Sequence, residues 1–130
     1  MTVLLLDTHV VLWWLSDDPR LGTGARDAIG GSPQAYVSAA STWEVAIKIA
    51  IGKLELDLPA DTSFGQLCAE QGFTLAPVTH EDAWSIRDLP ATRTDPFDRL
   101  IAGSARTRGW TVVTADPAFD AFDVPTMDAG

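Results

Sequence analysis

The chain has 130 residues, a length that predicts a single domain over residues 1–130. Eighteen acidic against nine basic residues give a net charge of −9, the wrong sign for a protein that holds nucleic acid mainly through a basic surface. No apolar run is long enough to span a bilayer, the start lacks the basic region of a signal peptide, and Cys68 has no partner for an internal disulfide. These features predict a cytoplasmic protein without a membrane segment.

Segments typical of strands and of helices alternate along the chain. Strands are predicted at Val3–Leu6, Ala35–Ser38, Phe73–Val78 and Trp110–Thr114, with a short edge strand at Asp123–Met127. Helices are predicted at His9–Leu15, Thr23–Ile29, Ser41–Ile51, Asp61–Gln71, Thr79–Leu89 and Asp95–Gly109. This alternation predicts an α/β fold with a mainly parallel sheet and helices on both faces.

Four acidic residues fall where such a sheet would gather them. Asp7 follows the first predicted strand, and Glu44 lies in the first turn of the helix after the second. Asp98 is in the first turn of a later helix, and Asp116 follows the strand that ends at Thr114. Sites in parallel α/β sheets form beyond the carboxyl ends of the strands. We therefore expect the four carboxylates to meet at one edge of the sheet.

Each of these acids also has a local, structural interpretation. Glu44 could reach back to the Ser41 N–H in a capping box, and Asp98 could favour the dipole of its helix. Asp7 and Asp116 could cap the segments that follow them. Together, however, four unpaired carboxylates at one sheet edge repel one another and cost stability unless cations neutralise them.

A carboxylate cluster of this kind suits hard divalent cations. Mg²⁺ and Mn²⁺ prefer oxygen ligands, and a pair of such ions can activate water and stabilise the leaving oxygen of a phosphodiester. Thr114 could orient a water or a carboxylate, although a β-branched residue is equally a structural choice for a strand. The sequence lacks the residues that other common sites require. His9, His80 and Cys68 form no zinc-binding pattern, and there is no P-loop or dinucleotide-binding glycine motif.

Four parts of the chain are similar to those of a known family. They are Leu4–His9, Ser41–Lys48 with Gly52–Leu54, Asp95–Ala102 and Thr114–Asp116. In order and spacing they resemble the PIN-domain ribonucleases, and in particular the VapC-type toxins of bacterial toxin–antitoxin pairs, over nearly the whole chain. The resemblance implies a PIN-like three-layer sandwich, endonucleolytic RNA cleavage, a homodimer and inhibition by a cognate antitoxin protein. It also implies Mg²⁺ or Mn²⁺ held mainly by Asp7 and Asp98, with Glu44 and Asp116 completing the cluster.

The chain departs from this family pattern at two places. Ser104 stands where many relatives carry Gln, and Arg93-Thr94 replaces a commoner His-Arg before Asp95. Neither departure touches the four acids, but both could alter the choice of substrate.

Two basic residues lie beside the acids and could bind substrate. Lys48 is four residues beyond Glu44, a spacing that favours a helix salt bridge at least as much as contact with an RNA phosphate. Arg99 follows Asp98 and could either pair with an acid of the cluster or hold a phosphate.

Tryptophans provide candidate surfaces for a protein partner. The segment Val10–Leu15, which contains Trp13 and Trp14, is apolar nearly all round when drawn as a helix. Such a helix is either deeply buried or has a face that awaits a partner. We favour a partner surface formed by Trp13, Trp14 and the expected neighbour Trp43.

Other functions remain as alternatives to the ribonuclease. A non-catalytic binding module of the same fold is the main one, although loss of one of the four acids would have marked it and none is lost. A phosphoryl-transferring α/β domain is disfavoured because Asp7-Thr8-His9 lacks the second early acid that such domains carry. DNA as substrate also stays open, since nothing in the sequence indicates how a 2′-hydroxyl would be recognised.

Overall fold

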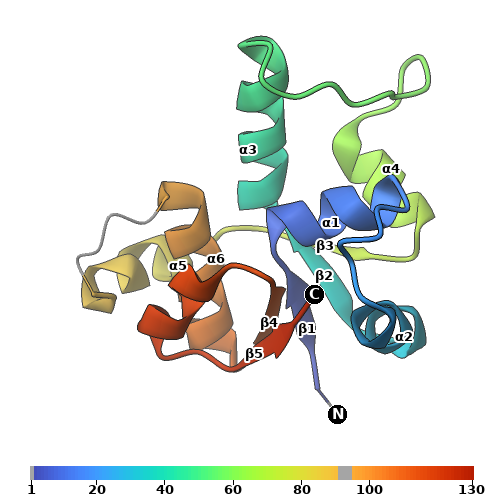
Figure 1. The fold of residues 1–130 in the computed structure, drawn as a ribbon. Coiled ribbons are helices and arrows are strands. Elements are labelled where there is room, and N and C mark those ends of the chain that lie inside the picture. The colour runs from blue at the N-terminus through green and yellow to red at the C-terminus, as the bar shows by residue number, and fades with distance from the viewer. Residues whose placement is uncertain (1, 91–94) are drawn as a thin grey trace.

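The computed structural model describes residues 2–90 and 95–130, and its centre is a parallel sheet (Figure 1). Within this part of the chain the strands are β1 (Leu4–Leu6), β2 (Ala35–Ser38), β3 (Thr74–Ala76), β4 (Thr111–Thr114) and β5 (Thr126–Asp128). The helices are α1 (Thr8–Leu15), α2 (Thr23–Gly31), α3 (Ala39–Ala50), α4 (Phe64–Glu70), α5 (His80–Ser85) and α6 (Pro96–Arg108), with short 3₁₀ segments η1 (Ile86–Asp88) and η2 (Pro117–Phe122).

The sheet order brings together strands that are distant in the sequence. Its order is β3-β2-β1-β4-β5, and every neighbouring pair runs parallel. Leu6 at the end of β1 pairs with Val37 of β2 and with Val113 of β4. The carboxyl ends of the three central strands are therefore level, and the segments that follow them begin at the same edge of the sheet.

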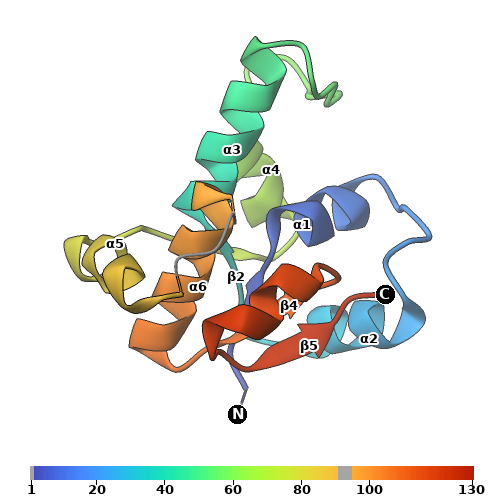
Figure 2. The same ribbon diagram turned by 60° about the vertical axis from the view of Figure 1, so that its left-hand side comes forward.

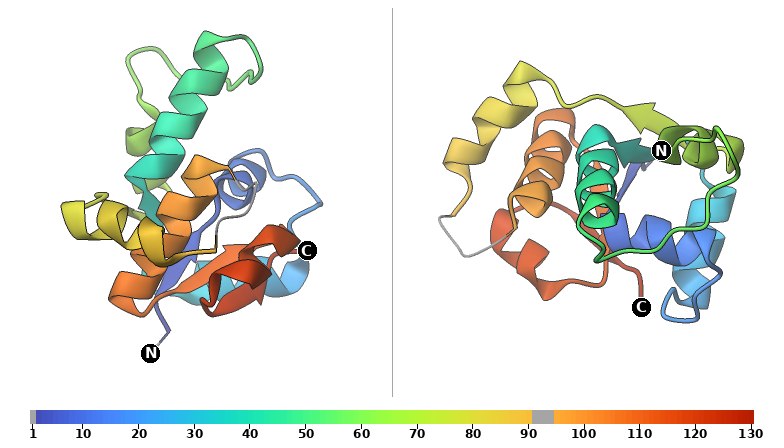
Figure 3. Two further views of the ribbon diagram at one scale, coloured as in Figure 1. Left: turned by 90° about the vertical axis from the view of Figure 1, so that its left-hand side faces the viewer. Right: turned by 90° about the horizontal axis from the view of Figure 1, so that it is seen from above.

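Helices cover both faces of the sheet, as the alternation predicts. Leu4 and Leu6 of β1 pack into one apolar cluster with residues of α1, α2 and α4. Leu5, whose side chain points the other way, packs with residues of α6 and η2. In the view from above in Figure 3, α5 and α6 lie on one side of the sheet, with α1, α2 and α4 on the other.

Helix α5 packs closely on α6 and extends that face. Gly103 of α6 allows the contact, because a Cβ there would lie 2.7 Å from the Ser85 Oγ. A buried ion pair fastens the same two helices, with Arg108 Nη2 2.7 Å from Asp82 Oδ2. The Thr107 hydroxyl donates to the other Asp82 oxygen at 2.7 Å, so both carboxylate oxygens of Asp82 are satisfied.

Helix α3 stands out from the rest of the molecule. Figures 1 and 2 show it projecting beyond the carboxyl edge of the sheet, so that its far half has few neighbours. The result is unusual exposure of apolar side chains, with Ile47, Ile49 and Ile51 exposed by 37%, 40% and 58%. Among the described residues, no helix is both long enough and apolar enough to cross a membrane.

Several predicted element boundaries differ from the structure, and for two helices the capping residue gives the reason. Helix α3 begins at Ala39, two residues before the predicted start, because the Ser38 hydroxyl caps it by accepting from the Ala40 N–H at 3.0 Å. Helix α4 does not begin at Asp61, whose φ of 61° is left-handed, but after Ser63, which forms a capping box. The 3₁₀ segment η2 was not predicted, and the edge strand β5 starts three residues later than expected.

Candidate active site

Asp7 is buried where β1 passes into α1, and both of its carboxylate oxygens accept hydrogen bonds. The Thr8 N–H donates to Oδ1 at 2.7 Å, and the Thr114 hydroxyl donates to Oδ2 at 2.9 Å. Burial raises the pKa of Asp7, and the charge of Glu44 adds to this effect, while these hydrogen bonds and the charge of His9 act in the opposite direction. Asp7 thus caps α1, as one local interpretation predicted, and also points into the shared site.

Glu44 is buried in the second turn of α3, one turn further along than predicted. Its Oε2 lies 2.6 Å from the Lys48 Nζ, which confirms the predicted i,i+4 salt bridge. Its Oε1 is buried and has no hydrogen-bond partner among the described residues. The predicted capping box with Ser41 is wrong, because the helix has already begun before Ser41. A buried carboxylate oxygen without a partner is costly, and a cation would satisfy it.

Asp98 lies in the first turn of α6, half-buried, and carries the most direct electrostatic evidence of a cluster. Burial, and after it the charges of Asp7, Asp95, Asp116 and Glu44 in that order, together raise its pKa to about 7. Four other carboxylates are therefore near enough to repel it. This result agrees with the prediction that the fold gathers acids from separate segments, and it adds Asp95, the N-cap of α6, to the group.

Thr114 connects the ends of β1 and β4. Its hydroxyl donates to Asp7 and accepts from the Asp116 N–H at 3.0 Å. Asp116 itself is exposed, and its Oδ1 accepts from the Ala118 N–H at 2.9 Å to begin η2. A single threonine therefore fixes one site carboxylate and the backbone of another.

A contact between two hydroxyl groups near the site was not predicted from the sequence. The Thr8 and Ser41 oxygens are 2.8 Å apart, although 33 positions separate these residues. This buried contact joins the start of α1 to α3, and so fixes the helix that carries Glu44 against the turn that carries Asp7. No periodicity could have shown it, because it depends on the strand order.

The donor set suits a hard cation that keeps part of its water. Across residues 2–90 and 95–130, no three or more His, Cys, Asp or Glu side chains converge closely enough to form a complete metal-ligand set. Mg²⁺ is commonly bound through one or two carboxylates and retained waters rather than by an all-protein cage. The unpartnered Glu44 Oε1 and the raised pKa of Asp98 both indicate a site that favours added positive charge.

Lys48 and Arg99, the two basic residues predicted to bind substrate, have different hydrogen-bond partners. The pKa of Lys48 is raised by its hydrogen bond to Glu44, with smaller effects from Asp95 and Asp98, so its ammonium lies over the cluster. The Arg99 guanidinium donates to the Pro90 carbonyl at 2.7 Å and to the Ile86 carbonyl at 3.3 Å.

Of the two departures from the family pattern, only Ser104 lies within the described residues. The Ser104 hydroxyl is buried in α6 without a hydrogen-bond partner among the described residues. The other, Arg93-Thr94, lies outside the described residues.

The three tryptophans predicted to bind a partner occupy different surroundings. Trp13 is half-buried, with the Arg20 guanidinium carbon 5.2 Å from its ring centroid. The Trp14 indole N–H donates to the Gln71 side chain at 3.1 Å. Trp43 is 53% exposed on the projecting helix α3, where it borders a different cavity from the one that Trp13 lines.

A parallel α/β sheet that gathers acids beyond the carboxyl ends of its central strands is the architecture of a PIN domain. The chain belongs to the PIN-domain family, whose sequence model matches residues 4–125. It is 36% identical over 117 residues to Ribonuclease VapC22 of Mycobacterium tuberculosis (strain ATCC 25618 / H37Rv), covering 89% of this chain and 88% of that protein.

Solved structures agree with the family on the fold. DNA-bound VapBC from Salmonella typhimurium matches with a TM-score of 0.69 at 18% identity, covering 100% of both chains. VapBC2 from Rickettsia felis, bound to a promoter DNA fragment, matches with a TM-score of 0.67 at 11% identity, covering 97% of this chain and 98% of that one. These likenesses confirm the predicted PIN-like three-layer sandwich.

Proposed function

We propose that this chain is a divalent-metal-dependent endoribonuclease that acts as the toxin of a type II toxin–antitoxin pair. Membership of the PIN-domain family and the 36% identity to a protein named as a ribonuclease support the enzyme class. The observation that carries the proposal is the buried, unpartnered Glu44 Oε1 beside Asp98, whose pKa burial and neighbouring acids raise to about 7. Such an arrangement is costly in the folded protein unless a cation binds there.

Asp7 and Asp98 would hold Mg²⁺ or Mn²⁺ mainly, with Glu44 and Asp116 completing the site directly or through water. A bound ion of this kind supplies an activated water and stabilises the negative charge of a cleaved phosphodiester. Thr114 keeps Asp7 in one orientation through its 2.9 Å hydrogen bond, so this carboxylate need not reorganise when an ion or a substrate arrives.

Lys48 has two roles in this proposal. Its ammonium partly neutralises Glu44, at a distance of 2.6 Å, and thereby limits the repulsion within the cluster. It also presents positive charge at the edge of an acidic site, where an RNA phosphate must approach. Arg99, which donates to the Pro90 and Ile86 carbonyls, remains a proposed phosphate-binding residue.

Metal-dependent cleavage tests the proposal. Purified protein freed of any bound partner should cleave a single-stranded RNA in Mg²⁺ or Mn²⁺, and EDTA should stop it. Asp98→Asn keeps the size of the side chain and should abolish cleavage, whereas Asp27→Asn, an exposed acid on α2, should cleave normally. A folded protein that binds RNA but cleaves none in either ion would favour the non-catalytic binding module, and cleavage of DNA alone would overturn the choice of substrate.

We further propose a cognate antitoxin protein as partner, a homodimer, and a cytoplasmic location. Two of the solved relatives are described as VapBC complexes bound to DNA, which supports a partner of antitoxin type. The exposed Trp43 borders an apolar cavity of about 570 Å³ that also includes Leu75, itself 47% exposed. Trp43→Ala should weaken partner binding by about 2 kcal/mol, with RNA cleavage kept. The corresponding roles of Trp13 and Trp14 stay predictions.

A further inference from the structure

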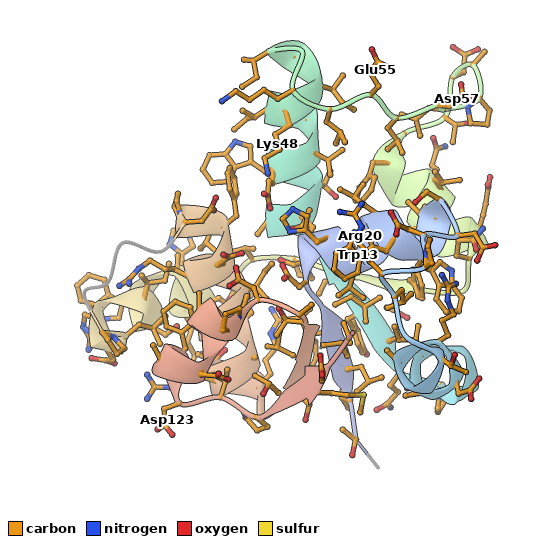
Figure 4. All side chains as sticks on the ribbon, in the orientation of Figure 1. Trp13, Arg20, Lys48, Glu55, Asp57 and Asp123 are labelled. Carbon is orange, nitrogen blue, oxygen red and sulfur yellow. The ribbon has the colours of Figure 1, made fainter. Side chains whose placement is uncertain are left out.

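A cavity of about 300 Å³ lies next to the acid cluster, between α1 and the segment that follows α3. Thr8 and Lys48 line it, and these residues also contact the site, since Thr8 donates to Asp7 and Lys48 pairs with Glu44. Figure 4 shows Lys48 on α3 above Trp13 of α1. A ligand in this cavity could therefore contact residues that themselves contact the carboxylates Asp7 and Glu44.

Three cationic side chains line the cavity together with two acids, Asp18 and Glu55. The sequence has two lysines, Lys48 and Lys53, and both line the cavity together with Arg20. No described acid lies within ion-pair distance of the Lys53 ammonium, whereas Arg20 is held by Asp18 with Nη2 2.7 Å from Oδ2. The other acid that lines the cavity, Glu55, is exposed on the loop (Figure 4). Lys53 is therefore the lining cation best placed to pair with an anionic group.

Trp13 and Arg20 also line the cavity, and their side chains contact each other. The Arg20 guanidinium carbon lies 5.2 Å from the Trp13 ring centroid, and Asp18 fixes the guanidinium through three hydrogen bonds from Nε and Nη2. Leu12 and Leu54 complete an apolar lining beside it. Nucleobases stack on aromatic rings and on guanidinium planes, so this wall has the chemistry that recognises an unpaired base.

We propose that this cavity binds one nucleotide of the single-stranded RNA substrate, adjacent to the phosphodiester that is cleaved. The base packs against Trp13 and Arg20, and a phosphate of the same nucleotide contacts Lys53. The inference rests on the proposed ribonuclease function and adds a substrate subsite to it. Lys53 favours this occupant, because Lys48 and Arg20 are already paired with Glu44 and Asp18, whereas the Lys53 ammonium has no described acid within ion-pair distance and would attract a phosphate.

The kinetic test compares matched variants. Trp13→Leu removes the aromatic plane but keeps apolar bulk, and Lys53→Ala removes the cation. The controls are Trp84→Leu, a tryptophan 68% exposed on α5 that also carries an arginine over its ring at 4.6 Å, and Arg106→Ala near the far end of α6. Trp13→Leu and Lys53→Ala should each raise the KM for a short single-stranded RNA by about 5-fold or more, with kcat within about 2-fold. Both controls should leave KM unchanged.

A binding measurement in EDTA separates this inference from the catalytic one. A fluorescein-labelled single-stranded RNA oligonucleotide is titrated with protein at several salt concentrations. Lys53→Ala should weaken binding and reduce the salt slope by about 0.7, whereas Trp13→Leu should weaken binding with the slope unchanged. Because Lys53 is exposed, its variant decides the question even where Trp13→Leu melts early.

Failure of either proposal gives a distinct result. A wild-type protein that cleaves no RNA in Mg²⁺ or Mn²⁺ overturns the proposed function. A wild-type protein that cleaves RNA, with Trp13→Leu and Lys53→Ala unchanged in KM and in RNA binding, overturns the nucleotide subsite alone. If Trp13→Leu and Lys53→Ala lose binding to a synthetic Leu/Arg-rich peptide but keep RNA binding, the cavity binds a protein segment. That result would also overturn the nucleotide subsite.

Discussion

Replacing Asp98 by asparagine removes a carboxyl group that burial and the neighbouring acids make hard to ionise. Its pKa in the folded protein is about 7, against an ordinary value of 3.8, so the folded state holds the proton more tightly than the unfolded state does. The group therefore costs stability as the pH rises through this interval. The cost is absent below the unfolded pKa and fully present above the folded one.

The size of the cost follows from the pKa difference. The full difference corresponds to about 4 kcal/mol, at about 1.4 kcal/mol for each pKa unit. Because Asp98 is only half-buried, solvent screens part of this energy, and we expect about 1 to 2 kcal/mol. In EDTA at pH 8, Asp98→Asn should be more stable than the wild type by this amount, and at pH 4 the two proteins should be nearly equal.

Urea unfolding at pH 4 and pH 8 in EDTA measures the effect. Asp27→Asn, an exposed acid on α2, is the control and should change the free energy of unfolding by no more than a few tenths of a kcal/mol at either pH. A destabilised Asp98→Asn at pH 8, or an equal difference at both pH values, would refute the electrostatic reasoning.

Three further outcomes follow from individual contacts. Asp82→Ala should lower the free energy of unfolding at pH 7 by about 2 kcal/mol in urea, because it removes the buried carboxylate that accepts hydrogen bonds from Arg108, Thr107 and the Thr79 N–H; a loss under about 0.5 kcal/mol would contradict this. Although burial alone would raise the pKa of Asp82, its hydrogen bonds lower it, so its contribution should be lost as the pH falls below the ordinary value of 3.8. Thr114→Val should slow RNA cleavage by about 10-fold or more, with Thr114→Ser restoring it, since the hydroxyl orients Asp7; equal rates in both variants would show that the hydroxyl is dispensable. Mg²⁺ should raise the melting temperature more than NaCl of the same ionic strength, and Asp7→Asn should reduce that rise; equal shifts in both salts would indicate screening rather than a bound ion.

The sequence by itself determined the fold class and supplied the proposed residues of the acidic site. Alternating strand and helix patterns leave few topologies, because parallel strands need crossover helices and those crossovers are right-handed. In such a sheet, residues just after a strand or at the start of the next helix are brought to one edge, and this is why Asp7, Asp98 and Asp116 could be placed without coordinates. The i,i+4 pair of Glu44 and Lys48 is likewise a local property of a helix.

Only the tertiary structure decided how these residues act on one another. The sequence predicted that α3 starts at Ser41, but in the structure Ser38 caps the helix, so that Glu44 lies in the second turn and Ser41 contacts Thr8. The pKa of Asp98 depends on distances between four segments and on burial, neither of which has a sequence pattern. The cavity beside the site has the same origin, because Lys53 and Trp13 meet across it from segments 40 residues apart.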